Sequence, residues 1–317
     1  MSVFRYLKNY IWHDKNMRYA IREQQILLNE INRKVNEGRL QQRIDYLKDK
    51  TLNSTEKGVS DERYCEHEVI VSLTSFGKRI FDVYLAIESI MQGTIKPNKI
   101  ILWLSENEFN GKMLPHTLQL QQVRGLEIKF CKDLRSYKKL IPSLKLYPDA
   151  CIITIDDDVI YEYDIVERLV NAHLNDTHTI CACRVHKIKL DSNNCLKSYM
   201  DWDWEACIYE EKRPVIFATG VGGVLYPPQC FSDEVFNENV FMDICPYADD
   251  VWFYAMALLN NTTIMQVYTG KPSGYYMELP SSSIDSLKAE NTNAANCRND
   301  IQIKAVFEKY GLYNKLV

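Results

Sequence analysis

From residue 68 onward, short apolar runs alternate with segments of helical periodicity. The runs are VIVSLTSF, KIILWLS, LEIKFCKD and CIITIDDD; they are rich in β-branched residues and bounded by polar or turn residues, as buried strands are. The segments RIFDVYLAIESIMQG and DIVERLVNAHLND have apolar positions at helical spacing. This alternation predicts an α/β fold with a mostly parallel sheet and helices on both faces. Ligands of such sheets bind beyond the carboxyl ends of the strands.

The first 50 residues differ in character from the rest of the chain. Apolar residues recur at helical spacing in two groups, Leu28, Ile31 and Val35, then Leu40, Ile44 and Leu47. The register breaks at Gly38, which predicts either two helices or one long kinked helix. The polar residues 51–66 are interpreted as a linker. We therefore expect a helical segment with its linker over residues 1–60 and a main domain over residues 61–317.

The helical segment is basic, since residues 1–50 hold eleven Lys or Arg and six acids. Three uses stay open for it. It can form a coiled-coil contact that makes a homo-oligomer, lie as an amphipathic helix on an anionic membrane, or pack on the main domain. Aromatic residues among the basic ones near the N-terminus support the membrane alternative.

Composition excludes several classes of protein. Of the 317 residues, 46% are hydrophobic and 25% charged, which is ordinary for a globular protein and not for a disordered or collagen-like one. A net charge of -4 argues against a nucleic-acid binder. No stretch of 18 apolar residues and no signal-peptide pattern occurs. We expect a cytoplasmic protein, with peripheral contact at the inner face of the membrane as a further hypothesis.

The ten cysteines are scattered along the chain. Cys181 and Cys183 form a C-x-C pair, and no C-x-x-C occurs. A zinc or disulfide framework needs tighter, repeated spacing, so we interpret all ten as free thiols in a reducing compartment. We expect His173, His178 and His186 on the surface of a helix or loop.

An acidic run, Asp156-Asp157-Asp158, directly follows the apolar strand CIITI. Side chains alternate along a strand, so Asp156 and Asp158 are expected on one side and Asp157 on the other. Adjacent carboxylates repel one another and are costly to desolvate, and a divalent cation relieves both effects. Mg²⁺ and Mn²⁺ bind through such carboxylates together with substrate phosphates. The run predicts a metal site; the alternative is a solvated acidic turn or a helix cap.

A second acidic pair, Asp249-Asp250, precedes the amphipathic segment VWFYAMALLN. Acids at a helix start interact favourably with the helix dipole, so N-capping is the alternative interpretation. One cap accounts for only one of the two acids. We therefore interpret the pair as a second catalytic group.

A glycine-rich segment, ATGVGGVLYPP, lies between the two acidic clusters. Gly220, Gly222 and Gly223 would let the backbone come close to a ligand. The spacing matches neither a dinucleotide fingerprint nor a P-loop. A tight strand entry explains the glycines equally well.

Two further segments carry candidate substrate contacts. In Trp202-Asp203-Trp204, ring faces can pack on a sugar while the carboxylate binds its hydroxyls; the alternative is a pair of core tryptophans. The Gly- and Pro-containing segment 268–275 includes Lys271 and can close over a donor, although a plain surface loop fits as well.

Together, these motifs resemble the GT-A glycosyltransferases, specifically sugar transferases of the bacterial capsule or O-antigen type. The resemblance covers residues 68 to about 275 and is carried by VSLTSFGKRI, DLRSYKKL, IITIDDDVIY, ATGVGGVLYPP and ADDVWF, in that order. It implies a GT-A catalytic domain over residues 61–317 and an inverting transfer of β1,3 type. It also implies Mn²⁺ or Mg²⁺ and a nucleotide-sugar donor, a UDP-sugar such as UDP-galactose.

The resemblance also assigns roles to residues. It implies that Asp158 ligates the metal, that Asp156 lies near the ribose or the metal, and that Asp157 binds through water or orients the loop. It implies that Asp250 is the base and that Asp249 orients a donor or acceptor group. Residues implied to lie near the nucleotide or its diphosphate are Thr74, Ser75, Arg79, Asp133 and Lys138.

The chemistry of sugar transfer is consistent with these roles. A metal on Asp158, helped by Lys138 or Lys271, would neutralise the diphosphate leaving group. A carboxylate can accept the proton of an acceptor hydroxyl, and attack from the opposite face inverts the anomeric centre. Many GT-A enzymes add a later His as a metal ligand. The last His here is His186, so Asp158, the diphosphate and water would hold the metal.

Two other enzyme classes and one non-enzyme stay as alternatives. A retaining GT-A transferase would give Asp250 another role. A nucleotidyltransferase would need a glycine-rich phosphate loop after the first strand, and SLTSFGKRI has one glycine. A sugar-binding or assembly protein would not need both acidic clusters. We expect the acceptor to be a glycan or a lipid-linked molecule of surface polysaccharide synthesis.

Overall fold

The computed structural model describes residues 2–208, 215–270, 277–283, 291 and 297–316, with most of their side chains from residue 17 onward. The chain forms two compact units, Met1–Asp49 and Lys50–Val317. No helix among the described residues has both the length and the hydropathy that a membrane crossing needs.

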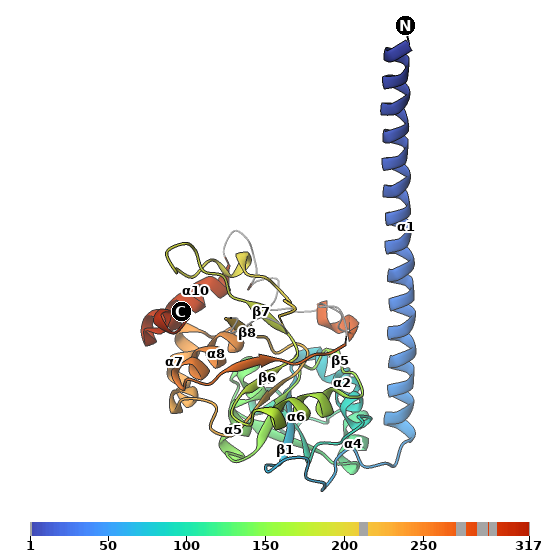
Figure 1. Cartoon of the computed structure of the whole chain (residues 1–317). Helices are drawn as coiled ribbons and strands as arrows, with labels where there is room; N and C mark the ends of the chain where they lie inside the picture. Colours follow the sequence, from blue (N-terminus) through green and yellow to red (C-terminus); the bar gives the residue numbers. More distant parts are fainter. Residues whose placement is uncertain (1, 209–214, 271–276, 284–290, 292–296, 317) are drawn as a thin grey trace. The chain divides into compact units, whose positions relative to one another are not determined.

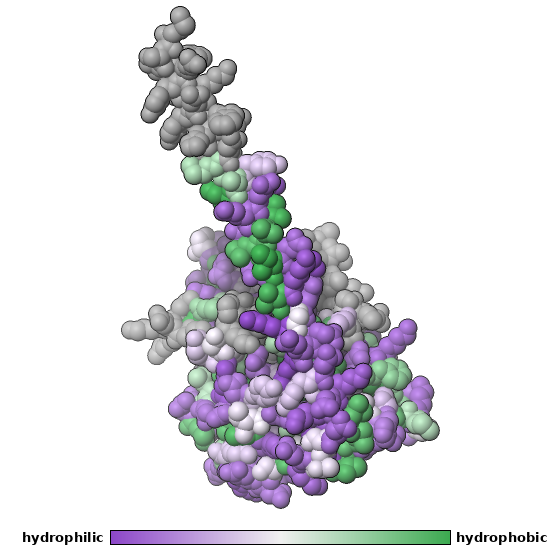
Figure 2. All heavy atoms as spheres, turned by 90° about the vertical axis from the view of Figure 1, so that its right-hand side faces the viewer, coloured by the Kyte–Doolittle hydropathy of each residue, from purple (hydrophilic) through white to green (hydrophobic). Residues whose placement is uncertain are grey.

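The first unit is formed by helix α1 (Ser2–Asn53), whose last turn belongs to the second unit (Figure 1). The alternative of two helices is wrong, because α1 continues through Gly38. One glycine costs a helix only about 1 kcal/mol relative to alanine, too little to break it. Leu28, Ile31 and Val35 are about half exposed, and Figure 2 shows apolar side chains gathered along the described part of the helix.

The second unit contains the predicted α/β fold, with a seven-stranded sheet in the order β10-β6-β9-β4-β1-β2-β3. Its strands are β1 (Val69–Thr74), β2 (Lys99–Ser105), β3 (Leu126–Cys131), β4 (Cys151–Thr154), β6 (Ile180–Ala182), β9 (Val224–Tyr226) and β10 (Ile264–Gln266). All neighbours pair in parallel except β9, which is antiparallel to both β4 and β6. The mostly parallel sheet is therefore confirmed.

Helices cover this sheet on both faces (Figure 1). The described helices of this unit after α1 are α2 (Val83–Met91), α3 (Glu106–Phe109), α4 (His116–Val123), α5 (Ile141–Leu146), α6 (Ile165–Asn175), α7 (Glu238–Ile244), α8 (Asp249–Leu259) and α10 (Arg298–Tyr310). Successive residues of β1 and β4 point to opposite faces and nearly all are buried, so both faces are covered.

Two small antiparallel sheets flank the carboxyl edge of the large one. Strand β5 (Val159–Ile160) pairs with β11 (Met277–Glu278), and β7 (Val185–Lys187) pairs with β8 (Ile216–Ala218). The β5–β11 pair fixes the chain immediately after the acidic run, since the backbone N–H of Leu279 donates to the carbonyl of Asp158 at 2.7 Å.

A buried ion pair anchors the segment that leads from α1 to β1. Arg124 and Glu88 form a bidentate pair at 2.8 and 2.9 Å, and both are almost fully buried. Arg124 also donates to the carbonyl of Glu56, and Glu88 accepts from the hydroxyl of Thr51. Losing either partner would leave a buried charge unpaired, which costs about 3–5 kcal/mol.

Candidate active site

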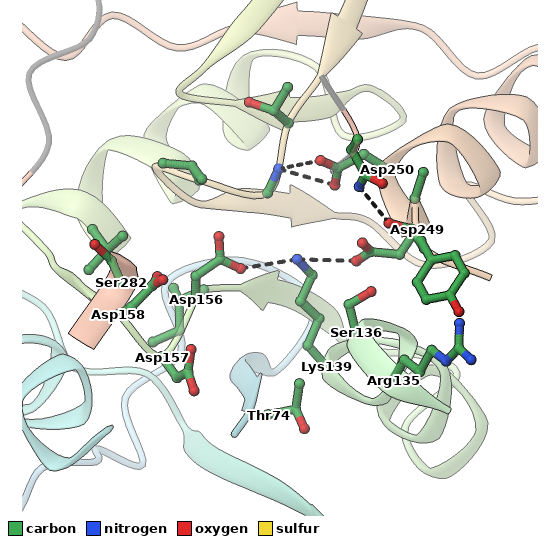
Figure 3. Close-up of a pocket in the computed structure, with 18 of the residues that line it drawn as sticks. Thr74, Arg135, Ser136, Lys139, Asp156, Asp157, Asp158, Asp249, Asp250 and Ser282 are labelled. Atoms are coloured by element: carbon green, nitrogen blue, oxygen red, sulfur yellow. Dashed lines mark hydrogen bonds and ion pairs between the residues drawn. The ribbon is translucent and has the colours of Figure 1, made fainter. Parts of the chain in front are cut away.

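A cavity of about 820 Å³ opens at the carboxyl edge of the sheet and contains both acidic clusters (Figure 3). It is bounded by the ends of β1 and β4, the start of α8 and the segment before β9. Its lining includes Thr74, Arg79, Asp133, Lys138, Lys139, Asp156, Asp157, Asp158, Trp204, Gly220, Asp249 and Asp250. Parallel strands are expected to present their ligand-binding residues at this edge.

The acidic run after β4 divides between two environments. Figure 3 shows the carboxylates of Asp156 and Asp158 on one side of the chain and that of Asp157 on the other. Asp157 is buried and accepts hydrogen bonds from Ser75 Oγ at 2.6 Å and from Arg79 at 3.0 Å. Burial raises the pKa of Asp157, and these two donors oppose the rise. Asp157 therefore holds the strand end in place.

Asp158 presents its carboxylate to the cavity. Arg79 donates to Asp158 at 2.7 Å and to the carbonyl of Ser282 at 3.2 Å. Burial and the neighbouring carboxylate of Asp156 raise the pKa of Asp158 to about 6, although Arg79 opposes the rise. The three carboxylates of the run pair with two cationic side chains, Arg79 and Lys139. Oxygen donors with excess negative charge fit Mg²⁺ or Mn²⁺.

Lys139 links the two acidic clusters. Its ammonium lies 3.0 Å from Asp156 Oδ1 and 3.1 Å from Asp249 Oδ2 (Figure 3). Burial opposes the charge of Lys139, but the carboxylates of Asp156 and Asp249 outweigh it, and its pKa rises well above the usual value. Lys139 is not among the residues predicted from the sequence, whereas its neighbour Lys138 is. Lys138 also lines the cavity, but its ammonium pairs with Asp133.

The second acidic cluster begins helix α8. Both carboxylate oxygens of Asp250 accept the backbone N–H of Gly220, at 3.1 and 3.2 Å. Burial and the charge of Asp249 raise the pKa of Asp250 to about 7, while Lys139 opposes the rise. A carboxylate whose pKa lies near neutral pH is suited to accept a proton in catalysis.

The glycine-rich segment approaches the cavity through Gly220, not through the predicted Gly222 and Gly223. A Cβ on Gly220 would lie 2.6 Å from Lys139 Nζ, so the ammonium would have to move if the glycine were replaced. Gly222 and Gly223 have φ values of 96° and 95° and do not line the cavity. They turn the chain into β9.

Of the three residues in the motif Trp202-Asp203-Trp204, only Trp204 lines the cavity. Trp204 lines the cavity and stacks on His186, with ring centroids 5.3 Å apart. Trp202 lies outside the cavity and packs edge-to-face on Phe217. Asp203 also lies outside it and pairs with a surface lysine.

Some of the remaining predicted residues line the cavity and others do not. Thr74 lines the cavity and donates its hydroxyl to the carbonyl of Trp103 at 2.8 Å, while Ser75 lies behind it on Asp157. Asp133 lies at the rim with Lys138. Lys271 lies outside the described residues.

The expectation that the histidines lie on the surface is wrong for two of them. His173 and His186 are each 1% exposed. His173 follows Ile165 and Leu169 at intervals of four, which places it on the inner face of α6. His186 lies in β7 beneath Trp204.

Comparison with solved structures agrees with the fold. The chain is similar to a mannosyltransferase from Pyrobaculum calidifontis in complex with GDP-Man and Mn²⁺. The TM-score is 0.50 and the identity 10%, over 87% of this chain and 72% of that chain. At this identity the likeness shows the fold alone, which is of the GT-A type.

Two further structures are less similar to this chain, and no conclusion about it is drawn from them. One is a CMP:2-keto-3-deoxy-manno-octonic acid synthetase complexed with CTP, with TM-score 0.37 and 10% identity over 71% of this chain and 98% of that chain. The other is HddC from Yersinia pseudotuberculosis, with TM-score 0.29 and 14% identity over 52% and 78%. No protein-family model and no curated protein matches the sequence.

Proposed function

We propose that this protein is a metal-dependent, inverting glycosyltransferase. It transfers a sugar from a nucleotide-sugar donor, a UDP-sugar such as UDP-galactose, to a glycan or lipid-linked acceptor of capsule or O-antigen synthesis. The observation that carries the proposal is the Lys139 ammonium, which joins Asp156 at the end of β4 to Asp249 at the start of α8. Two acidic groups with different partners therefore face one cavity, as a transfer reaction with a leaving group and a nucleophile requires.

The donor would bind at the β4 side of the cavity. Asp156 and Asp158 are the residues that would hold Mn²⁺ or Mg²⁺, whose chemistry would be to neutralise the diphosphate leaving group. Arg79 already lies 2.7 Å from Asp158 and adds a fixed positive charge there. Lys138 and Thr74 also line the cavity and would contact the diphosphate and the nucleoside.

The acceptor would bind at the α8 side. The Gly220 N–H fixes the Asp250 carboxylate, which would accept the proton of the attacking hydroxyl. Lys139 pairs with the neighbouring Asp249, which would orient a sugar hydroxyl. Trp204 lines the cavity and would pack on a pyranose ring. Attack from the side opposite the diphosphate inverts the anomeric centre.

A turnover assay tests this proposal. We expect UDP release from at least one UDP-sugar in the presence of Mn²⁺ and an acceptor extract, and its loss on adding EDTA. Asp250→Asn should retain donor binding and lose turnover. Asp243→Asn is the matched control, because Asp243 is an exposed aspartate on α7, and it should behave like the wild type.

Product analysis separates the alternatives. Anomeric NMR of the product should show inversion; retention would contradict the role of Asp250 as the base. Release of pyrophosphate from a nucleoside triphosphate and a sugar phosphate would instead establish a nucleotidyltransferase. Thermal shift across UDP-, GDP- and CMP-sugars identifies the nucleotide, since a ligand that binds the folded state raises the melting temperature.

We also propose that α1 contacts a second copy of the chain. Its exposed Leu28, Ile31 and Val35 lie at helical spacing and gain stability when a partner covers them. An Ile31→Glu/Val35→Glu variant should lower the mass in solution. An unchanged mass together with binding to anionic vesicles would support the membrane alternative instead.

A further inference from the structure

A cluster of soft ligands lies at the amino end of β4, at the edge of the sheet opposite the cavity. It consists of Cys65, Cys151 and His173, whose ligand atoms all lie within 4.8 Å of one another. Cys151 Sγ and His173 Nε2 are 3.4 Å apart. The three residues come from three separate segments: the chain before β1, the first position of β4, and the last turn of α6.

Each ligand is positioned by the fold around it. The backbone N–H of Cys151 donates to the carbonyl of Glu68 at 2.8 Å, which places the first residue of β4 beside the chain entering β1. His173 is 1% exposed on the inner face of α6. Its Nδ1 is buried without a hydrogen-bond partner among the described residues, so its ring contacts polar atoms only within the cluster. The Cys65 thiol lies 3.2 Å from the carbonyl of His67.

We propose that Cys65, Cys151 and His173 bind a thiophilic divalent cation, Zn²⁺, at a site separate from the carboxylates of the cavity. Two sulfur ligands and an imidazole are the donor set that zinc prefers, whereas Mg²⁺ and Mn²⁺ prefer oxygen. The 3.4 Å between Cys151 Sγ and His173 Nε2 is close to the roughly 3.5–4 Å that separates neighbouring ligands of a tetrahedral zinc ion, and all three ligand atoms lie within 4.8 Å of one another. Solvent would occupy the fourth position. Both thiols lose their protons to the solvent when the ion binds.

Such an ion would cross-link the segment before β1 to β4 and α6. That segment has no regular secondary structure between Asn53 and Val69. It is also held by Arg124, which donates to the carbonyl of Glu56, and by Asn98, which donates to the carbonyls of Ser60 and Glu62. Binding to the folded state alone would raise the melting temperature. The site would therefore be structural and independent of the proposed transfer reaction.

Cobalt substitution tests the site on the full-length protein. The reduced, chelator-treated protein is titrated with Co²⁺ and then with Zn²⁺. We expect the strong absorption of tetrahedral Co²⁺ with thiolate charge-transfer bands, and its loss when Zn²⁺ displaces the cobalt. A carboxylate site would give only the weak bands of octahedral cobalt, so Co²⁺ spectra of that kind alone would overturn the proposal.

Variants assign the bands to the cluster. Cys65→Ser should lose the charge-transfer bands; it changes a half-buried residue outside the sheet, and His173→Gln serves as a second ligand variant if the first fails to fold. Cys195→Ser, at an exposed cysteine, and Asp158→Asn should both keep them. Bands that persist in both ligand variants, or that vanish in Asp158→Asn, would refute the site. A disulfide between Cys65 and Cys151 in the non-reduced protein would also refute the zinc site, because the disulfide and not a metal ion would then join the two segments.

Discussion

Lys139→Met removes the ammonium that joins the two acidic clusters while retaining most of the volume of the side chain. Lys139 lies 3.0 Å from Asp156 and 3.1 Å from Asp249, and its side chain is 9% exposed. At an effective dielectric constant of about 20, one such contact amounts to roughly 5 kcal/mol. Removing one partner of a buried pair costs about 3–5 kcal/mol. We therefore expect the free energy of unfolding to fall by about 3 kcal/mol.

Denaturant unfolding at about pH 8 in EDTA measures this loss, with Lys138→Met as the matched control. Lys138 pairs with Asp133, whose side chain is 50% exposed, so water solvates the carboxylate left behind. Surface pairs contribute about 1 kcal/mol or less. The control should therefore lose much less stability than Lys139→Met.

Two changes of condition should reduce the loss in Lys139→Met. The charge of Asp250 interacts with Lys139, and its folded-state pKa of about 7 lies above that of an aspartate in an unfolded chain. As the pH falls below this value the folded state takes up a proton and Asp250 loses its charge, so the positive charge of Lys139 contributes less to stability. Added Mn²⁺ should act similarly by supplying positive charge. Equal losses in both lysine variants, or wild-type stability of Lys139→Met, would refute the reasoning.

Further predictions concern pH, metal and the glycine. Turnover should rise with pH through about 7, because Asp250 must lose its proton to act as the base; a pH–rate profile with no limb in this range contradicts that role. Asp158→Asn should weaken activation by Mn²⁺ by roughly 10-fold or more in a metal titration, whereas Asp243→Asn should match the wild type. Gly220→Ala should lower kcat about 100-fold with an unchanged circular dichroism spectrum, because the new methyl group displaces the ammonium of Lys139; wild-type kcat would show that the displacement is harmless.

The main features of the sheet were predictable because its central strands are buried on both faces. The sequences of β1 and β4 are therefore nearly continuous apolar runs. The acids that follow β4 lie at the edge of the sheet where ligands bind. The direction of β9 was not predictable. Its three residues carry no signal that distinguishes antiparallel from parallel pairing.

Within the site, residue types were easier to predict than orientations. Lys138 and Lys139 are adjacent, so composition and spacing do not distinguish them. The short 3₁₀ turn Arg135–Lys139 aims one ammonium at Asp133 and the other at the acidic clusters. The cluster of Cys65, Cys151 and His173 was not predicted from the sequence because its three ligands are far apart in the chain. Spacing rules detect only ligands that share a local motif.

The reversed course of β9 has a consequence for how specificity could be redesigned. The segments that follow the parallel strands β1, β2, β3, β4 and β6 reach the cavity, whereas at β9 the loop that precedes the strand does so. Thr219 and Val221 flank Gly220 in that loop and line the cavity without joining the Lys139 contacts. A library that varies these two positions would sample new acceptor preferences while leaving the hydrogen-bonded register of the sheet intact.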